Sequence, residues 1–130
     1  MPPIKDFKTI PEMFDVVTKT YGVNKTYIKH KIDGKYVDIN YQEVRDITEN
    51  LALGLASFGI KRGDKVAIIS ENRPEWYYSD FAILGLGAIN VPIYPNSTSD
   101  SIEYIINNSE SVGVIVSTKF QLNKVLKIKS

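Results

Sequence analysis

The sequence predicts an α/β fold with a partial parallel sheet, built as β-α-β-α-β-α and preceded by a helix, a β-hairpin and a helix. Three short apolar runs carry this prediction, over residues 65–69, 88–93 and 111–116. A helix-length segment follows each run, and this alternation is typical of parallel strands joined by right-handed crossovers. We interpret residues 1–39 as a leading helix and hairpin, and residues 40–130 as the α/β unit.

The first helix is predicted to begin after Thr9, whose side chain can cap it, with Glu12 completing a capping box. Gly22 is expected to end this helix, because glycine tolerates the left-handed backbone found there. Apolar side chains recur at helical spacing between these residues. The predicted buried face comprises Ile10, Met13, Phe14, Val17 and Tyr21.

A β-hairpin is predicted next, because residues 27–32 and 35–39 alternate apolar and polar side chains. Asp33 and Gly34 between them suit a two-residue turn that needs positive φ. The single histidine, His30, lies in this hairpin among lysines. We interpret it as a solvated side chain rather than a catalytic one.

The second helix is expected to begin after Asn40, with Glu43 three residues later as the partner in a capping box. Its predicted buried stripe comprises Val44, Ile47, Leu51 and Leu55. Gly59 is expected to end it, and residues 61–64 then form a tight turn into the first parallel strand.

Polar residues after each predicted strand can cap the following helices. The expected caps are Asn72 or a near neighbour, Thr98 or Ser99, and Thr118. Gly85 and Gly87 mark the end of the helix between the first two strands. Pro92 has no N–H to donate to a ladder, so we expect it at a strand end or on an edge strand.

The composition excludes several classes of protein. Lys+Arg 16 against Asp+Glu 15 gives net charge +1, which argues against a dedicated nucleic-acid binder. Zero cysteines exclude disulfides, thiolate zinc sites and thiol catalysis. No apolar run approaches the ~20 residues that a membrane span needs, and no signal-peptide pattern opens the chain. The expectation is a cytoplasmic protein without a nucleic-acid partner.

Two polar segments follow predicted strands, at the edge where open α/β sheets bind ligands. In residues 71–75 each side chain has a local use, so helix capping and solvation are favoured over a binding loop. Residues 94–100 could present N–H groups to an anion, although a capping loop is again favoured. Basic side chains in the last segment are interpreted as a solvated helix face, namely Lys119, Lys124, Lys127 and Lys129. No catalytic residue and no metal ligand can be assigned.

Short motifs follow one another closely through residues 40–117. They are Leu-x-x-x-Gly-Ile-x-x-Gly-Asp-x-Val-Ala over residues 55–67, Asn72, Pro74-Glu75-Trp76, Gly87-Ala88, Val91-Pro92 and Ser109-Glu110. In this order they resemble the N-terminal region of the adenylate-forming (AMP-binding) enzymes, which include acyl-CoA synthetases, luciferases and peptide-synthetase adenylation domains. Residues 71–76 (ENRPEW) and 87–98 (GAINVPIYPNST) look most like the long-chain fatty acyl-CoA synthetase branch.

The resemblance implies a parent enzyme that activates a fatty acid with ATP to acyl-AMP and then transfers the acyl group to CoA, assisted by Mg²⁺. The family's phosphate loop and catalytic motifs come later in its chain. We therefore expect an incomplete N-terminal part of the large domain, inactive alone and binding no cofactor. In some relatives the loop after the Val-Pro strand carries an arginine near CoA. The corresponding residues here, without an arginine, are Asn96, Ser97 and Thr98.

Two alternatives remain open on the sequence. The chain could be a stand-alone, non-catalytic α/β binding or interaction module, or part of an adenylate-forming enzyme for another class of carboxylate. For a ligase parent, peripheral association with a membrane is a further expectation. Truncation would leave apolar faces uncovered, so we also expect self-association through them.

Overall fold

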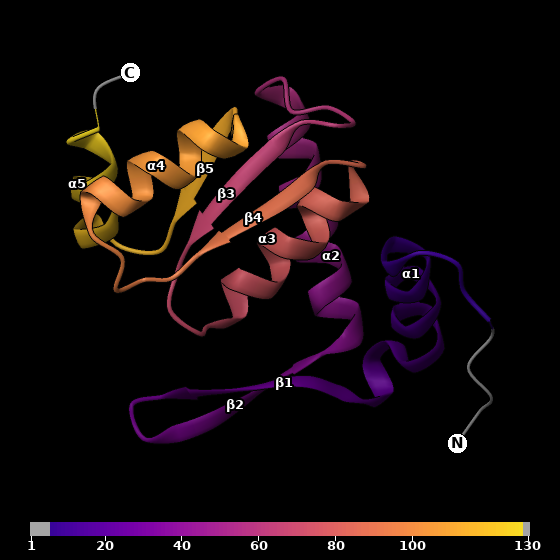
Figure 1. Ribbon diagram of the computed structural model, residues 1–130. Helices are drawn as coiled ribbons and strands as arrows, with labels where there is room; N and C mark the ends of the chain where they lie inside the picture. The colour runs from indigo at the N-terminus through magenta and orange to yellow at the C-terminus, as the bar shows by residue number, and fades with distance from the viewer. Residues whose placement is uncertain (1–5, 129–130) are drawn as a thin grey trace.

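The computed structural model describes residues 6–128 and contains two helical layers around a parallel sheet, with a hairpin set apart from it (Figure 1). Its elements are α1 (Ile10–Tyr21), η1 (Gly22–Asn24), β1 (Thr26–Ile32), β2 (Lys35–Asn40), α2 (Tyr41–Ser57), β3 (Lys65–Ile69), α3 (Pro74–Gly85), β4 (Ile89–Ile93), α4 (Ser99–Ser109), β5 (Gly113–Val116) and α5 (Lys119–Leu126). This order confirms the predicted fold class.

The parallel sheet has the strand order β4-β3-β5, so β3 is central and the other two strands lie at its edges. Lys65–Ile69 pairs with Ile89–Ile93 on one side, and Val66–Ile69 pairs with Gly113–Val116 on the other. Pro92 therefore lies on an edge strand, as expected from its missing N–H.

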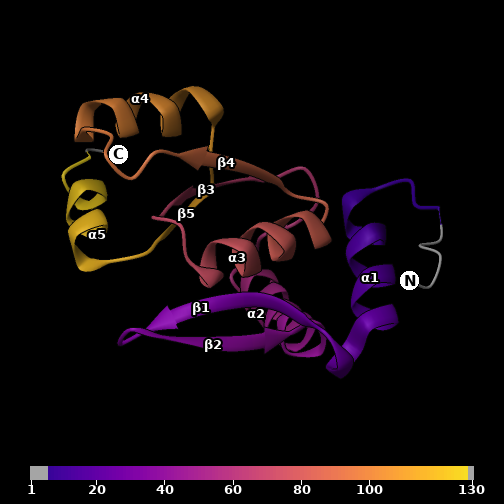
Figure 2. The ribbon, with the colours of Figure 1, turned by 90° about the horizontal axis from the view of Figure 1, so that it is seen from below.

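The core follows the alternation of side chains along β3. Val66 and Ile68 point to one face, where they pack with Ile83 of α3. Ala67 and Ile69 point to the other face and pack with residues that include Ile102 of α4. Figure 2 shows α3 and α4 on opposite sides of the sheet. These four apolar side chains of β3 are at most 1% exposed, so the strand is buried on both faces.

A third apolar cluster joins α1, α2 and α3 to the base of the hairpin, and its buried members are Phe14, Val44 and Tyr78. The hairpin turn has positive φ at Asp33 (49°) and Gly34 (80°), as predicted. No helix within residues 6–128 combines the length and apolar character needed to cross a membrane.

The predicted buried faces of the first two helices need correction. Ile10 and Ile47 are 52% and 42% exposed, whereas Thr18 and Thr48 are buried. The Thr18 hydroxyl donates to the Phe14 carbonyl oxygen at 2.7 Å, so its burial leaves no unpaired donor. Thr18 and Thr48 thus take buried positions that the apolar pattern did not predict.

Helix capping was predicted with mixed success. The Asn40–Glu43 capping box is complete, with both of its hydrogen bonds at 2.8 Å. Thr9 accepts from the Glu12 N–H, but the Glu12 carboxylate accepts from the N–H of Lys8 rather than from that of Thr9. Thr98 and Thr118 cap α4 and α5 as expected. Asn72 does not cap α3: the cap position falls on its neighbour Arg73, without a side-chain hydrogen bond.

Candidate functional site

The candidate site lies at the carboxyl edge of the parallel sheet, where ligands bind in open α/β folds. Three segments meet there: residues 70–73 after β3, residues 94–98 after β4 and residues 117–118 after β5. Side chains of α5, which begins directly after the third segment, connect the other two.

Gln121 is the residue that connects these segments. It is only 1% exposed, although it lies on a short helix near the end of the chain. Its Nε2 donates to Glu71 Oε1 at 3.1 Å and to the Pro95 carbonyl oxygen at 2.8 Å. Among residues 6–128 its Oε1 has no hydrogen-bond partner. One buried amide therefore holds the segments after β3 and β4 against α5.

Glu71 serves as a fixed acceptor in this network. Its Oε2 accepts from Ser117 Oγ at 2.5 Å, and its Oε1 accepts from Gln121. These hydrogen bonds to the charged form lower the pKa of Glu71 to about 2, with the Ser117 bond the larger cause. The carboxylate is thus ionised at neutral pH and unsuited to general acid chemistry. The interpretation of residues 71–75 as capping and solvation misses this link across the sheet.

Lys124 holds the loop after β4. Its Nζ donates to the carbonyl oxygens of Pro95 (2.8 Å) and Ser97 (2.9 Å), and lies 4.8 Å from the centre of the Phe120 ring. The interpretation of Lys124 as part of a solvated basic face is therefore wrong. The useful signal was present in the sequence: α5 follows a strand that ends at the same edge, so its first turns must face the neighbouring loops.

An open hollow of about 590 Å³ lies beside this network. Its lining comprises Glu71, Pro95, Asn96, Ser97, Thr98, Phe120, Gln121 and Lys124. The Thr98 hydroxyl accepts from the Ser101 N–H as the cap of α4, which confirms the capping interpretation of this loop. The hollow combines an ammonium group with an aromatic ring that is 67% exposed. These groups suit a ligand that carries a flat ring and an anionic group.

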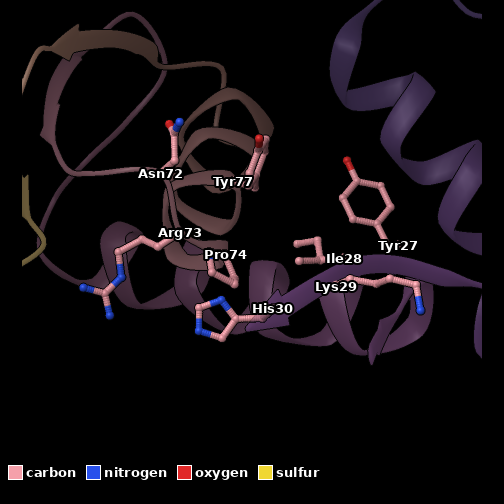
Figure 3. A pocket seen from close by; sticks show the side chains of 8 residues that line it. All are labelled: Tyr27, Ile28, Lys29, His30, Asn72, Arg73, Pro74 and Tyr77. Atoms are coloured by element: carbon pink, nitrogen blue, oxygen red, sulfur yellow. The ribbon is translucent and has the colours of Figure 1, made fainter. Parts of the chain in front are cut away.

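A second hollow, of about 460 Å³, lies between the hairpin and the start of α3 (Figure 3). It is lined by Tyr27, Ile28, Lys29, His30, Asn72, Arg73, Pro74 and Tyr77. Figure 3 shows the His30 ring beside Pro74, while the Lys29 side chain points away from it. His30 is half-buried on the lining of this open hollow, which still leaves part of its ring accessible to solvent.

The cations around this second hollow are paired within the protein. Arg73 Nε donates to Glu75 Oε2 at 2.9 Å, and another guanidinium nitrogen donates to the Ser117 carbonyl oxygen at 3.3 Å. The bond from Arg73 is the main cause that lowers the pKa of Glu75. Lys29 is paired with Asp38 at 2.9 Å. Both cations of this hollow thus have carboxylate partners, whereas Lys124 beside the first hollow has none among the described residues, and we place the candidate site at the sheet edge.

Comparison with known proteins gives the chemical context of this edge. Residues 14–130 match the family described as AMP-binding enzyme. The chain belongs to this family. The match covers the α/β unit and most of the leading helix and hairpin, which confirms the resemblance drawn from the motifs.

Curated relatives in this AMP-binding family include long-chain fatty acid ligases. The chain is 36% identical over 97 residues to "Long-chain-fatty-acid--CoA ligase FadD15" of Mycobacterium tuberculosis, which covers 75% of the chain. It is 32% identical over 120 residues to "Long-chain-fatty-acid--CoA ligase ACSBG1" of Rattus norvegicus, which covers 92% of the chain. The aligned part spans 16% of the length of each relative.

Solved structures of several proteins share the fold. Klebsiella oxytoca NpsA in complex with 3-hydroxyanthranilyl-AMSN matches 96% of the chain with TM-score 0.78 and 23% identity, over 23% of its own length. The Brucella canis acyl-CoA synthetase matches 85% of the chain with TM-score 0.78 and 22% identity, over 20% of its length. The separately solved N-terminal subdomain of NpsA also matches, with TM-score 0.78 and 24% identity.

Proposed function

We propose that this chain is the N-terminal portion of the large AMP-binding domain of a long-chain fatty acid–CoA ligase. The parent activates a fatty acid with ATP to acyl-AMP and transfers the acyl group to CoA. The observation that carries the proposal is the identity to ligases of this name over 75% and 92% of the chain. Residues 1–39 then form the leading helix and hairpin, and residues 40–130 the α/β unit.

Within the parent, these residues act as scaffold and as part of a substrate-binding edge. No group of three or more histidine, aspartate or glutamate side chains that could hold a metal occurs within residues 6–128. We assign no step through Mg²⁺ to the described residues. ATP and Mg²⁺ are expected to bind later parts of the parent, which acts in the cytoplasm or at a membrane surface.

The proposal extends to CoA, whose nucleotide end carries a purine ring and phosphate groups. We assign its contact to the hollow beside Asn96, Ser97 and Thr98. The loop lacks an arginine, but Lys124 supplies a cation beside it. The Lys124 ammonium group donates to two carbonyl oxygens, which leaves one of its three N–H groups free among the described residues. The exposed Phe120 ring offers a surface on which the base can stack.

The first experiment is to read the gene beyond Ser130 and assay the parent. A T-T-G and P-K-G phosphate loop within the next several dozen codons supports the ligase. The purified parent should then form palmitoyl-CoA from palmitate, ATP and CoA. A stop codon without such a loop would support a non-catalytic module. A phosphate loop with turnover of a benzoate-type acid, and none of palmitate, would point to another carboxylate class.

The CoA contact is tested separately in that parent. Lys124→Met removes the cation, and we expect the KM for CoA to rise about tenfold with a smaller change in kcat. The matched control is Lys127→Met, because Lys127 is exposed, directly follows the same helix and lies outside the hollow. Lys124→Arg should restore most of the affinity. Equal KM values for CoA in the wild type and Lys124→Met would contradict the assignment.

A further inference from the structure

One backbone carbonyl at the carboxyl edge of the sheet accepts hydrogen bonds from two side chains of α5. The Pro95 oxygen lies 2.8 Å from Gln121 Nε2 and 2.8 Å from Lys124 Nζ. The two donors are three residues apart, so they lie on the same side of the helix. The Lys124 ammonium group, which lines the hollow of about 590 Å³, therefore shares its acceptor with a buried amide. The position of this carbonyl thus limits the positions that the ammonium group can take.

Glu71 determines which way the Gln121 amide is turned. An ionised carboxylate only accepts hydrogen bonds, and so does a backbone carbonyl. Both neighbours of the amide, Glu71 Oε1 at 3.1 Å and the Pro95 oxygen at 2.8 Å, therefore require its NH₂ group. The opposite orientation would place Gln121 Oε1 against two acceptors in a buried position. Ser117 Oγ, which donates to the other oxygen of Glu71, holds the carboxylate in place.

We propose that Gln121 is a positioning residue for CoA binding: its amide, oriented by Glu71, holds the Pro95 carbonyl so that Lys124 directs an N–H group toward CoA. This inference rests on the proposed contact between Lys124 and CoA. Gln121 is 1% exposed, so it offers a ligand almost no surface and acts on CoA through Lys124. The hydrogen bonds that carry the proposal all join residues between 71 and 124, which the structure describes.

The proposal is tested by a double-mutant cycle in the parent enzyme, with kcat and the KM for CoA measured for each variant. Gln121→Leu removes both donors, and we expect the KM for CoA to rise roughly fivefold, with kcat within about twofold of the wild-type value. In the Lys124→Met background the same substitution should leave the KM unchanged, because Gln121 acts through Lys124. The matched control, Gln42→Leu, should leave both constants unchanged, because Gln42 donates to Asp46 within α2.

The outcomes separate this inference from the proposed function. If Lys124→Met raises the KM for CoA and Gln121→Leu does not, the positioning role is ruled out and the CoA contact stands. The same holds if both substitutions raise the KM and their effects multiply in the double variant. If Lys124→Met leaves the KM for CoA unchanged, the CoA contact fails, and the positioning role fails with it.

Glu71→Gln is a second variant, for which positioning and simple electrostatics predict opposite results. Glu71 lines the hollow, so removal of its negative charge alone would favour an anionic ligand such as CoA. An amide at this position can present either its oxygen or its NH₂ group to Gln121, which then loses its fixed orientation. We therefore expect the KM for CoA to rise about threefold. A KM that falls or stays unchanged would overturn the proposal, and this variant decides if Gln121→Leu does not fold.

Discussion

Gln121 shows how much a single buried side chain contributes to the candidate site. Gln121→Leu keeps a similar volume but removes both hydrogen bonds from Nε2, and leaves Glu71 Oε1 and the Pro95 carbonyl oxygen without this donor. We expect a loss of about 1–3 kcal/mol in the free energy of unfolding, measured by urea denaturation. The control Gln42→Leu changes a side chain whose amide, among the described residues, hydrogen-bonds only to Asp46 in the same helix, and it should cost much less. Equal losses in the two variants would contradict the connecting role of Gln121.

Glu71 gives this network a pH dependence. Its pKa falls from an ordinary value of 4.5 to about 2 on folding, so the ionised form is favoured in the folded state. The stabilisation is therefore complete above the unfolded pKa of 4.5 and is lost as pH falls through about 2. The difference in unfolding free energy between wild type and Glu71→Gln should shrink over that window.

Other carboxylates also titrate at low pH, so the comparison needs a control. The pKa of Asp15, for example, is lowered by hydrogen bonds from Lys19 and then Arg45. The control is Glu103→Gln, because Glu103 lies outside the Glu71 network. The difference in unfolding free energy between this variant and the wild type should not shrink over the same pH window. A carboxyl ¹³C titration of Glu71 with an ordinary midpoint would refute the prediction directly.

The sequence predicted residues at the site only in part. It placed Asn96, Ser97 and Thr98 in the loop after the second strand, and the structure puts all three on the lining of the hollow. Gln121 and Lys124 were not predicted, because a polar side chain on a short amphipathic helix is usually solvated. Their burial depends on carbonyl groups of Pro95 and Ser97, more than two dozen residues earlier. Such pairings over a long sequence separation leave no local pattern.

At the scale of elements, two glycines make opposite predictions. Gly87 ends α3 with φ +72°, and a Cβ there would lie 3.1 Å from Arg62 Cγ. Gly87→Ala should therefore destabilise the protein by about 1–2 kcal/mol. Gly54 lies within α2 with nothing within 4 Å of an added Cβ, so Gly54→Ala should stabilise it by about 0.5–1 kcal/mol. Thermal or urea unfolding measures both, and changes of the same sign would contradict this reading of the two backbones.

Elements were predictable where local chemistry determines them. The predicted strand over residues 65–69 coincides with β3, and the Asp33-Gly34 turn and the Asn40–Glu43 box form as expected. The sequence was less informative at Glu12, where two N–H donors compete for one carboxylate, and at Asn72, where the cap position falls on the next residue, Arg73. The sequence cannot decide between Lys8 and Thr9 as the partner of the Glu12 carboxylate, because both lie within reach of it.

At the scale of the whole molecule, we predict that the 130-residue chain alone has no adenylation activity. Residues 6–128 hold a three-stranded parallel sheet with a candidate binding edge, but the sequence contains neither the T-T-G nor the P-K-G motif of the phosphate loop in the family that it resembles. We expect no palmitate-dependent exchange of pyrophosphate into ATP by this chain alone, with the full-length parent as the positive control. Exchange above background that requires palmitate would contradict the prediction.

The parts of the carboxyl edge of the sheet are synthesised in a fixed order. Residues 94–98 leave the ribosome well before Gln121 and Lys124, which hold their carbonyl groups. Before Gln121 and Lys124 emerge, all three strands of the parallel sheet have already been synthesised. The loop of residues 94–98 at that stage still lacks the two side chains that hydrogen-bond to its carbonyl groups. We therefore expect this loop to become ordered last during synthesis, when α5 docks onto the sheet. A nascent chain that is stalled with only the residues up to 118 outside the ribosome would have a formed sheet and an open loop, a difference that protease protection of stalled chains can reveal.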